Sequence, residues 1–182
     1  KIEKYVHLLL TFNKRYNLIS RTTEKDVWLR HILDSAQLVS FIDNKVKGSV
    51  SDLGSGAGLP GLIIAMFNDN NDFHVKLYEK SSVKRNFLSK TIKELELNAE
   101  ILNNVYEDKI YSKYVVCRAF KKLNKILDIS REMVEKPHKL IILKGKNAQA
   151  EINAVSLTAD YSYKLEKSIT DNDSKIIIIN AK

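Results

Sequence analysis

The stretch that most constrains this chain is VSDLGSGAGLPG, residues 50–61. A short β-prone segment ends at Leu53, three glycines follow at alternate positions, and Pro60 precedes an apolar run. Glycines allow positive φ and the close approach of a ligand to the backbone. Pro60 fits a first helical turn, and the exposed amides of a helix start favour a polar or anionic ligand group. The stretch predicts a strand, a tight loop and a helix start that form a small-molecule site on an α/β scaffold.

The spacing of these glycines matches two nucleotide-binding patterns. Gly56, Gly58 and Gly61 fit the G-x-G-x-x-G pattern of dinucleotide-binding folds. The wider frame, Asp52 followed by Gly54, Gly56 and Gly58, is similar to the loop that binds S-adenosylmethionine (AdoMet) in class I methyltransferases. A ligand-free turn explains alternate glycines after a strand poorly, because turn chemistry alone does not require them. The loop by itself leaves both nucleotides open.

Two amphipathic helices are expected before the glycine loop. Apolar residues recur near the helical period over residues 1–18 and again over residues 23–42. The second segment opens with Thr23 and Asp26, which resemble a capping box. Its expected apolar stripe comprises Trp28, Ile32, Ala36 and Val39, with Leu29 and Leu33 beside it. These segments predict an N-terminal helical cap over residues 1–45.

From residue 49 the pattern alternates between strands and helices. Strands are expected at residues 49–53, 73–78, 99–102, 114–117 and 140–143, with a closing hairpin of 161–166 and 176–180. Such alternation favours a mostly parallel sheet with helices on both faces, and ligands then bind at the carboxyl ends of the strands. We expect a single α/β domain, 1–182, whose seven-stranded core occupies residues 49–182.

Composition limits the partners and the compartment. The chain has 30 Lys and Arg against 22 Asp and Glu, a net charge of +8, which favours an RNA or DNA partner. A composition rich in Lys, Asn and Ile accounts for the surplus equally well. No apolar run approaches the about 20 residues that span a bilayer, and no signal-peptide pattern is present. A single cysteine, Cys117, excludes an internal disulfide. We expect a cytoplasmic monomer that does not associate with membranes.

Glu79 follows the second expected strand directly. At that position a carboxylate lies beside the glycine loop and can accept hydrogen bonds from ribose hydroxyls, which NAD and AdoMet share. A solvated carboxylate beside Lys80 is the alternative. The end of a strand next to the loop favours the ribose contact.

Short blocks outside the loop narrow the choice. They are N-K-x-Y-N-L (13–18), R-H-I-L-D-S (30–35), K-R-x-F-L (84–88), R-A-F (118–120) and K-G (144–145). With the glycine loop they stand in family order, and the chain resembles the bacterial small-subunit rRNA guanine-N7 methyltransferase family (glucose-inhibited division protein B). The block at 30–35 is the most informative, because it is unrelated to general AdoMet binding.

The resemblance implies a class I AdoMet-dependent (Rossmann-like) methyltransferase fold, AdoMet as methyl donor, no metal, and 16S rRNA or the small ribosomal subunit as partner. Glu79 would bind the ribose, the Val105-Tyr106 main chain would cradle the adenine, and Arg118 would face cofactor and substrate together. The implied cofactor-binding residues are Gly54, Ser55, Gly56, Gly58, Leu59, Glu79, Val105, Tyr106 and Arg118.

The two-residue segment expected to contact the adenine departs from the family pattern. The family usually has an acid where this chain has Tyr106 and an arginine where it has Asn104. A register shift of one residue would supply the acid from Glu107.

The expected chemistry needs no general base, because neutral guanine N7 carries a lone pair and no proton. Alignment and the exclusion of water are then the tasks of the protein, with Arg118 as an orienting residue. A structural salt bridge is the alternative role of Arg118. The Asn/Asp-Pro-Pro-Tyr/Phe motif of exocyclic-amine methylation is absent. Cys117 lacks the Pro-Cys context of a cytosine-C5 nucleophile and is expected to be a small buried residue.

Basic residues are candidates for RNA contacts. Lys144 and Lys146 follow the fifth expected strand at the ligand edge. The other candidates are Lys14, Arg15, Arg21 and Arg30. His31 and Asp34 share one helix face and would support the loop from the cap. A histidine whose hydrogen bonds are satisfied within the core is the alternative. A lone histidine is not a metal site.

Two other functions remain open from the sequence. The first is a nicotinamide-dependent dehydrogenase that uses the same loop, although no proton-relay pair is evident after the fourth expected strand. The second is an inactive RNA-binding relative, which the departures at Asn104 and Tyr106 permit.

Overall fold

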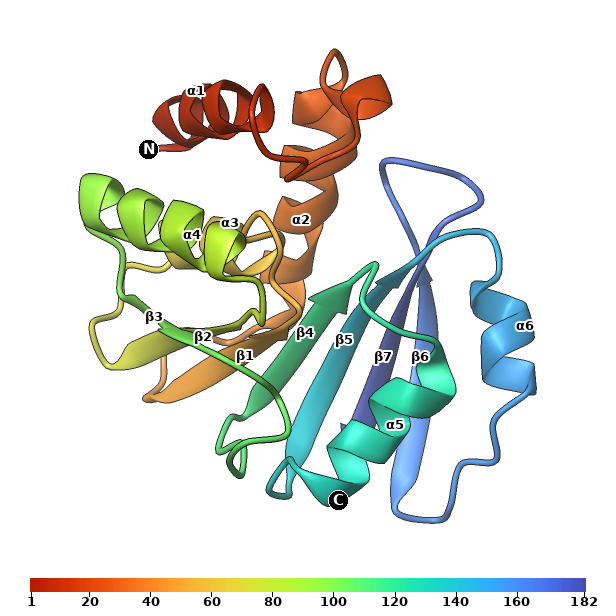
Figure 1. The fold of residues 1–182 in the computed structure, drawn as a ribbon. Coiled ribbons are helices and arrows are strands. Elements are labelled where there is room, and N and C mark those ends of the chain that lie inside the picture. The colour runs from red at the N-terminus through yellow and green to blue at the C-terminus, as the bar shows by residue number, and fades with distance from the viewer.

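A seven-stranded sheet with the strand order β3-β2-β1-β4-β5-β7-β6 forms the centre of the molecule (Figure 1). The computed structural model describes residues 1–182. The strands are β1 (Gly48–Leu53), β2 (Phe73–Tyr78), β3 (Ala99–Leu102), β4 (Tyr114–Arg118), β5 (His138–Lys144), β6 (Tyr161–Lys167) and β7 (Lys175–Ala181). Strands β1 to β5 are parallel, and β7 pairs antiparallel with β5 and β6. The predicted sheet is confirmed, and each strand boundary lies within two residues of its expected place.

Helices cover both faces of this sheet (Figure 1). One layer contains α1 (Ile2–Asn13), α3 (Gly61–Met66) and α4 (Ser82–Leu95), and the other contains α5 (Leu123–Glu132) and α6 (Ala148–Asn153). Alternate residues of a strand pack into two separate cores, one on each face of the sheet. Val116 packs with α1, α3 and α4, whereas its neighbours Val115 and Cys117 pack with α5 and α6. No helix has the length and apolar character needed to cross a membrane.

Helix α1 ends at Asn13, earlier than the residue 17 expected. The Asn13 side chain is buried and explains this end. Its Oδ1 accepts hydrogen bonds from the Leu18 and Ile19 amides, at 2.8 and 2.9 Å, and its Nδ2 donates to the Ile19 carbonyl oxygen. These bonds turn the chain and offer the backbone an alternative to another helical turn.

The second N-terminal helix occupies residues 28–41 and is called the cap helix here. It begins with a π-helical segment, Trp28–Leu33, continues as α2 (Asp34–Ala36) and ends as the 3₁₀ segment Gln37–Phe41. The capping box is wrong: Thr23 Oγ1 donates to the Ser20 carbonyl oxygen and contacts His31 Nε2 instead.

The expected apolar stripe of the cap helix is also partly wrong. Trp28, Leu29 and Leu33 are exposed, whereas the buried residues of this helix are His31, Ile32, Ser35 and Leu38. A π-helical turn is wider than an α-helical turn, so residues spaced at 3.6 per turn drift off the buried face. The apolar side chains at 28, 29 and 33 therefore face solvent.

Candidate active site

The glycine loop between β1 and α3 depends on left-handed backbone angles. Gly54, Gly56 and Gly58 have φ values of +72°, +59° and +87°, which side chains with a Cβ rarely adopt. The amides of Gly54 and Ser55 both donate to the Tyr78 carbonyl oxygen at 2.9 Å, so the loop is anchored to the end of β2. Tyr5 Oη of α1 donates to the Ala57 carbonyl oxygen at 2.8 Å and supports the loop from the cap.

Gly61 and Asp52 join the helix start to the sheet. A Cβ at Gly61 would lie 2.4 Å from Leu77 Cδ2 and 2.7 Å from Asp52 Oδ2. The Gly61 amide donates to that same oxygen at 2.9 Å. Asp52 is completely buried, and burial raises its pKa to about 7 against the hydrogen bonds that lower it. Asp52 therefore lies under the loop and has a structural role there, because it binds the first amide of α3.

Gly56 differs from the other loop glycines in its surroundings. A Cβ at Gly54 would collide with the Phe120 ring at 2.3 Å, and one at Gly58 with Leu62 at 2.3 Å. At Gly56 the nearest atom would be the Gly54 carbonyl oxygen at 3.8 Å. The space beside Gly56 is therefore open to a ligand.

Glu79 closes one side of that space. Its carboxylate accepts hydrogen bonds from the Gly56 amide at 2.9 Å and from the Ser81 amide at 2.8 Å, one on each oxygen. The side chain is only slightly exposed. A carboxylate has about four lone-pair sites, so Glu79 keeps capacity for further donors.

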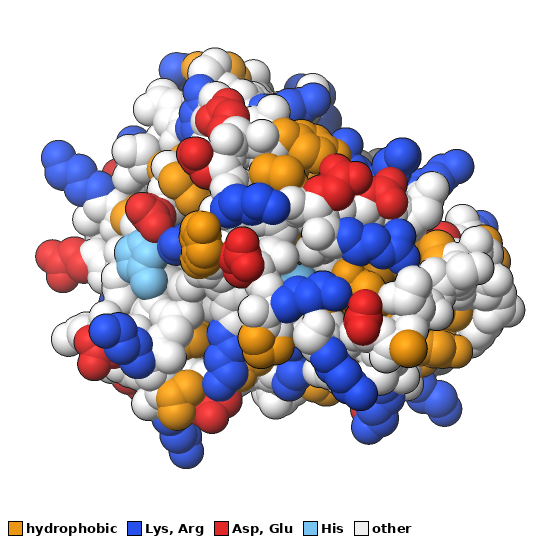
Figure 2. Space-filling model, turned by 90° about the horizontal axis from the view of Figure 1, so that it is seen from below, with side chains coloured by type: hydrophobic (Ala, Val, Ile, Leu, Met, Phe, Trp, Pro, Cys, Tyr) orange, Lys and Arg blue, Asp and Glu red, His pale blue; other side chains and the backbone are white.

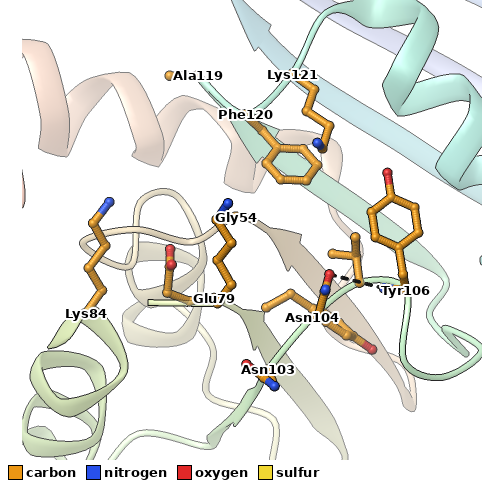
Figure 3. Close-up of a pocket in the computed structure, with 12 residues that line it drawn as sticks. Gly54, Glu79, Lys84, Asn103, Asn104, Tyr106, Ala119, Phe120 and Lys121 are labelled. Atoms are coloured by element: carbon orange, nitrogen blue, oxygen red, sulfur yellow. Dashed lines mark hydrogen bonds between the residues drawn. The ribbon is translucent and has the colours of Figure 1, made fainter. Parts of the chain in front are cut away.

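The glycine-loop cavity opens in front of Glu79 and has a volume of about 330 Å³. Figure 3 shows Glu79 and Lys84 on one side, Asn104 and Tyr106 on another, and Phe120 with Lys121 across from them. Its lining residues are Gly54, Tyr78, Glu79, Lys80, Lys84, Asn103, Asn104, Val105, Tyr106, Ala119, Phe120 and Lys121.

Several expected cofactor residues line this cavity, and others do not. Gly54, Glu79, Val105 and Tyr106 are among its walls, whereas Gly56 is not, although its amide binds Glu79. Ser55, Gly58 and Leu59 are buried in the loop behind it. Glu107 lies outside the cavity, where its Oε1 accepts a hydrogen bond from Asn103 Nδ2.

Phe120 and Lys84 were not assigned from the sequence, although both belong to the quoted blocks at 118–120 and 84–88. Their presence in these blocks was the signal that could have identified them as site residues. Their approach to the cavity depends on how the loops after β2 and β4 fold back over the strand ends.

Arg118, which was expected to face cofactor and substrate together, is not among the residues that line the glycine-loop cavity. Its guanidinium donates to three acceptors of the cap helix: the Arg30 carbonyl oxygen at 3.0 Å, Asp34 Oδ2 at 3.3 Å and His31 Nδ1 at 2.9 Å. These contacts turn the side chain from the end of β4 toward the cap helix. The sequence could not show this, because the partners lie more than 80 residues away.

His31 is neutral in this arrangement. Burial lowers its pKa to about 4, and the charges of Arg118 and Arg30 act in the same direction. Because a guanidinium can only donate, Nδ1 is the acceptor and the proton is on Nε2, which faces Thr23 Oγ1 at 2.8 Å. Thr23 in turn donates to the Ser20 carbonyl oxygen, so each side-chain group in this series of hydrogen bonds has a partner.

A second cavity, of about 250 Å³, lies between the cap helix, the end of β4 and the loop joining β6 to β7. This cap cavity is lined by Thr23, Arg30, His31, Asp34, Arg118, Ala119, Thr170, Asp171 and Ser174. Ala119, with φ +49°, also lines the glycine-loop cavity, so the two cavities meet at this residue.

The β6–β7 loop is held against the cap helix by side-chain hydrogen bonds. Thr170 Oγ1 donates to Asp34 Oδ1 at 2.7 Å. Gln37 donates to Ser168 Oγ at 3.2 Å and accepts from the Ile169 amide at 3.1 Å. The segment between the expected hairpin strands, 161–166 and 176–180, was not assigned to a site, so its contribution to a cavity wall was missed.

The six basic residues expected to contact RNA differ in their exposure and in the groups that they bind. Lys144 is mostly buried, pairs with Glu151 at 2.8 Å and donates to the Lys121 carbonyl oxygen, so it is a structural contact. Arg30 pairs with Asp171 at 3.4 Å at the cap cavity. The remaining four are exposed: Lys14, Arg15, Arg21 and Lys146. The face at the amino ends of the parallel strands shows basic and acidic side chains intermixed (Figure 2).

Comparison with solved structures defines the class of protein. The fold matches an AdoMet-dependent methyltransferase from Aquifex aeolicus with a TM-score of 0.65, at 14% identity over 85% of this chain and 91% of that one. It matches the Synechocystis magnesium protoporphyrin IX methyltransferase, solved with bound AdoMet, with a TM-score of 0.69, at 14% identity over 90% and 86% of the two chains. The protein has the class I AdoMet-dependent methyltransferase fold.

Sequence comparison then gives the family. The family model described as rRNA small subunit methyltransferase G matches residues 1–177. Relatives named ribosomal RNA small subunit methyltransferase G include one from Pelagibacter ubique, 36% identical over 98% of this chain and 86% of its own length. Another, from Orientia tsutsugamushi, is 39% identical over 98% and 88%. The chain belongs to the rRNA small subunit methyltransferase G family.

Membership of this family decides between the two nucleotides that the glycine loop left open. The methyl donor is AdoMet, which removes the nicotinamide-dependent dehydrogenase, and the enzyme is a methyltransferase of small-subunit (16S) rRNA. The resemblance, the fold class and the cofactor predicted from the sequence are confirmed.

Proposed function

We propose that this enzyme transfers the methyl group of AdoMet to N7 of a guanine in the decoding-region loop of 16S rRNA, acting as a monomer in the cytoplasm. One observation carries the reaction: a cavity built on the glycine loop and Glu79 adjoins a polar cavity at Ala119. Two neighbouring cavities that share Ala119 as a lining residue suit a donor and an acceptor that must meet in line.

The residues present fit AdoMet. The open space at Gly56 admits a ligand against the loop backbone, and Glu79 retains lone pairs for two ribose hydroxyls. Val105, Tyr106 and Phe120 offer apolar and aromatic surface to an adenine ring. We assign the cofactor to this cavity, with Ser55, Gly58 and Leu59 shaping the loop from behind.

The protein supplies orientation rather than proton transfer. When bound, AdoMet supplies an electrophilic sulfonium methyl group. Guanine N7 has no proton to lose, so the chain needs no general base at that atom. The buried groups agree with this: Asp52 lies under the loop outside both cavities, and burial raises the pKa of Cys117 to about 12. Arg118, held by the cap helix, is assigned to orienting the RNA side of the reaction.

RNA binding is assigned to the edge that carries the cap helix. Arg30 lines the cap cavity, and the other candidate cations, in the N-terminal segment and after β5, are exposed. The assigned phosphate contacts are Lys14, Arg15, Arg21, Arg30 and Lys146. We propose that residues 1–45 and 49–182 act as one domain, because Tyr5, Leu9 and Leu38 share a core with Val75 and Leu77 of the sheet.

The test is the incorporation of labelled methyl groups from AdoMet into naked 16S rRNA and into 30S particles, followed by nucleoside analysis. The expected product is 7-methylguanosine at one position. Label on cytosine C5 or on an adenine amine would overturn the N7 assignment. An absence of label, with AdoMet binding intact, would favour an inactive RNA-binding relative.

A further inference from the structure

The cap cavity has room for more than an ion. Its volume is about 250 Å³, whereas one bound water needs only about 10–15 Å³. Eight of its nine lining residues are polar or charged, the exception being Ala119. A ligand here is therefore recognised by hydrogen bonds and placed next to the glycine-loop cavity.

The carboxylates of this cavity differ in what they can still accept. Asp34 is occupied, since Oδ1 accepts from Thr170 and Gln37 and Oδ2 accepts from Arg118. In Asp171, Oδ1 accepts from the Asp173 amide, whereas the hydrogen bond from Arg30 to Oδ2 is long, at 3.4 Å. The Asp171 side chain is 33% exposed. It therefore has acceptor capacity for a ligand.

The charge state of Asp171 suits that role. The hydrogen bond from the Asp173 amide is the main cause that holds its pKa below the usual value, and Ser174 and Arg30 act in the same direction. The carboxylate is ionised at neutral pH and only accepts hydrogen bonds. Arg30, beside it, only donates.

This pair matches one edge of guanine. On that edge an acceptor, O6, stands next to two donors, N1–H and the 2-amino group. A base that is taken out of its stack for chemistry is read by hydrogen bonds to this edge. Adenine has a donor in place of O6 and an acceptor in place of N1–H, so the same pair of side chains would oppose it.

We propose that the cap cavity binds the target guanine, with Asp171 accepting from N1–H and the 2-amino group and Arg30 donating to O6. The base then directs N7, which lies on another edge, toward Ala119 and the glycine-loop cavity. The guanidinium plane of Arg118, fixed by three acceptors, is a surface on which the base stacks. This inference rests on the proposed function and adds the residues that select guanine.

The test combines a protein variant with a base analogue. Inosine lacks the 2-amino group and retains N1–H, O6 and N7. It is placed at the mapped methylation position by ligating 16S rRNA from two pieces and reconstituting 30S particles. The variant is Asp171→Asn, which can still accept from the Asp173 amide. The control is Asp173→Asn, an equal change of charge in the same loop at a residue outside the cavity.

With guanosine particles, Asp171→Asn is expected to lower kcat/KM about 10- to 100-fold, the effect of losing hydrogen bonds to a charged group. Asp173→Asn should stay within about twofold. Inosine should cost the wild type a similar factor and Asp171→Asn much less, because the partner of the 2-amino group is already changed. Calorimetric affinity for AdoMet should be equal in all three proteins, which separates the base site from the cofactor site.

Three results would overturn the proposal: equal losses in the two Asn variants, an unchanged guanosine-to-inosine ratio in Asp171→Asn, or a wild type that methylates both particles alike. Failure of the wild type to methylate any guanine would instead overturn the proposed function. A second readout is the affinity of the particles for the enzyme with S-adenosylhomocysteine, in which Asp171→Asn should lose preference for guanosine.

Discussion

The two cavities are built in different ways. The glycine-loop cavity depends on backbone geometry, and its central contact, from the Gly56 amide to Glu79, joins residues 23 positions apart. The cap cavity depends on side chains from distant segments: Thr170 and Asp34 are 136 positions apart, and Arg30 and Asp171 are 141 apart. The proposed cofactor half of the site is therefore encoded by nearby segments, and the proposed RNA half exists only when both ends of the chain dock. Substitutions should separate the two halves.

The largest effect is expected for Gly56→Asp. The backbone at this residue has a positive φ, the space beside it is open to the ligand, and its amide already faces the Glu79 carboxylate. A second carboxylate there fills the site and repels Glu79. AdoMet affinity measured by calorimetry should fall below detection, at least about 100-fold. The control is Gly48→Ala, whose Cβ would meet only ordinary contacts at 3.8 Å. Unchanged affinity in Gly56→Asp would place the cofactor elsewhere.

Glu79→Ala should be the next largest. It removes the acceptor of the Gly56 and Ser81 amides together with the proposed ribose contact. We expect AdoMet to bind about 30- to 100-fold more weakly, since hydrogen bonds to a charged group are lost. Titration with S-adenosylhomocysteine measures this, and Glu100→Ala on the exposed surface of β3 is the matched control. An affinity equal to that of the control would remove Glu79 from the site.

Asp34→Asn tests the other half. Asp34 holds both Arg118 and Thr170, so its neutral variant loosens the cap cavity while the glycine loop is untouched. Methyl transfer to 30S particles should fall about 10-fold, with AdoMet affinity within about twofold of the wild type. Asp43→Asn, at an exposed residue just after the cap helix, is the control. A parallel loss of AdoMet affinity would show that the two halves are not separable.

The smallest effect concerns stability. Because the folded state holds the pKa of His31 at about 4 against 6.5 in the unfolded chain, the unfolded state binds a proton first as pH falls. The contribution of His31 is fully present above pH 6.5 and is lost as pH falls toward 4. Between pH 7.5 and about 5.8, the free energy of unfolding in urea should drop about 1 kcal/mol more in the wild type than in His31→Gln.

The difference between these two proteins isolates His31 from other titrating groups. Burial also lowers the pKa of His138, and it raises that of Asp52 to about 7, which has the opposite effect on stability as pH falls. Both groups are present in the wild type and in His31→Gln. Identical pH profiles of the two proteins would mean that His31 is not held neutral by the cap.

Sequence reasoning succeeded where the signal is local. The strands alternate their contacts between two cores, so their apolar runs fixed their positions closely, and the glycine loop with Glu79 followed from spacing along two adjacent strands. It failed in the cap helix, where a π-helical segment exposes Trp28, and it could not identify the acceptors of Arg118, which come from the N-terminal segment. Helical period and strand order do not report such contacts.

The sequence by itself determined the α/β fold, the nucleotide loop and, through the family blocks, the reaction and its donor. Only the tertiary structure decided that Arg118 leaves the glycine-loop cavity, that Asp171 reaches Arg30, and that the two cavities meet at Ala119. The physical reason lies in the kind of interaction. Backbone conformation and apolar period are properties of neighbouring residues, whereas a polar site made of side chains forms only where packing brings distant donors and acceptors together. The glycine loop can therefore be predicted from the sequence, whereas the cap cavity cannot.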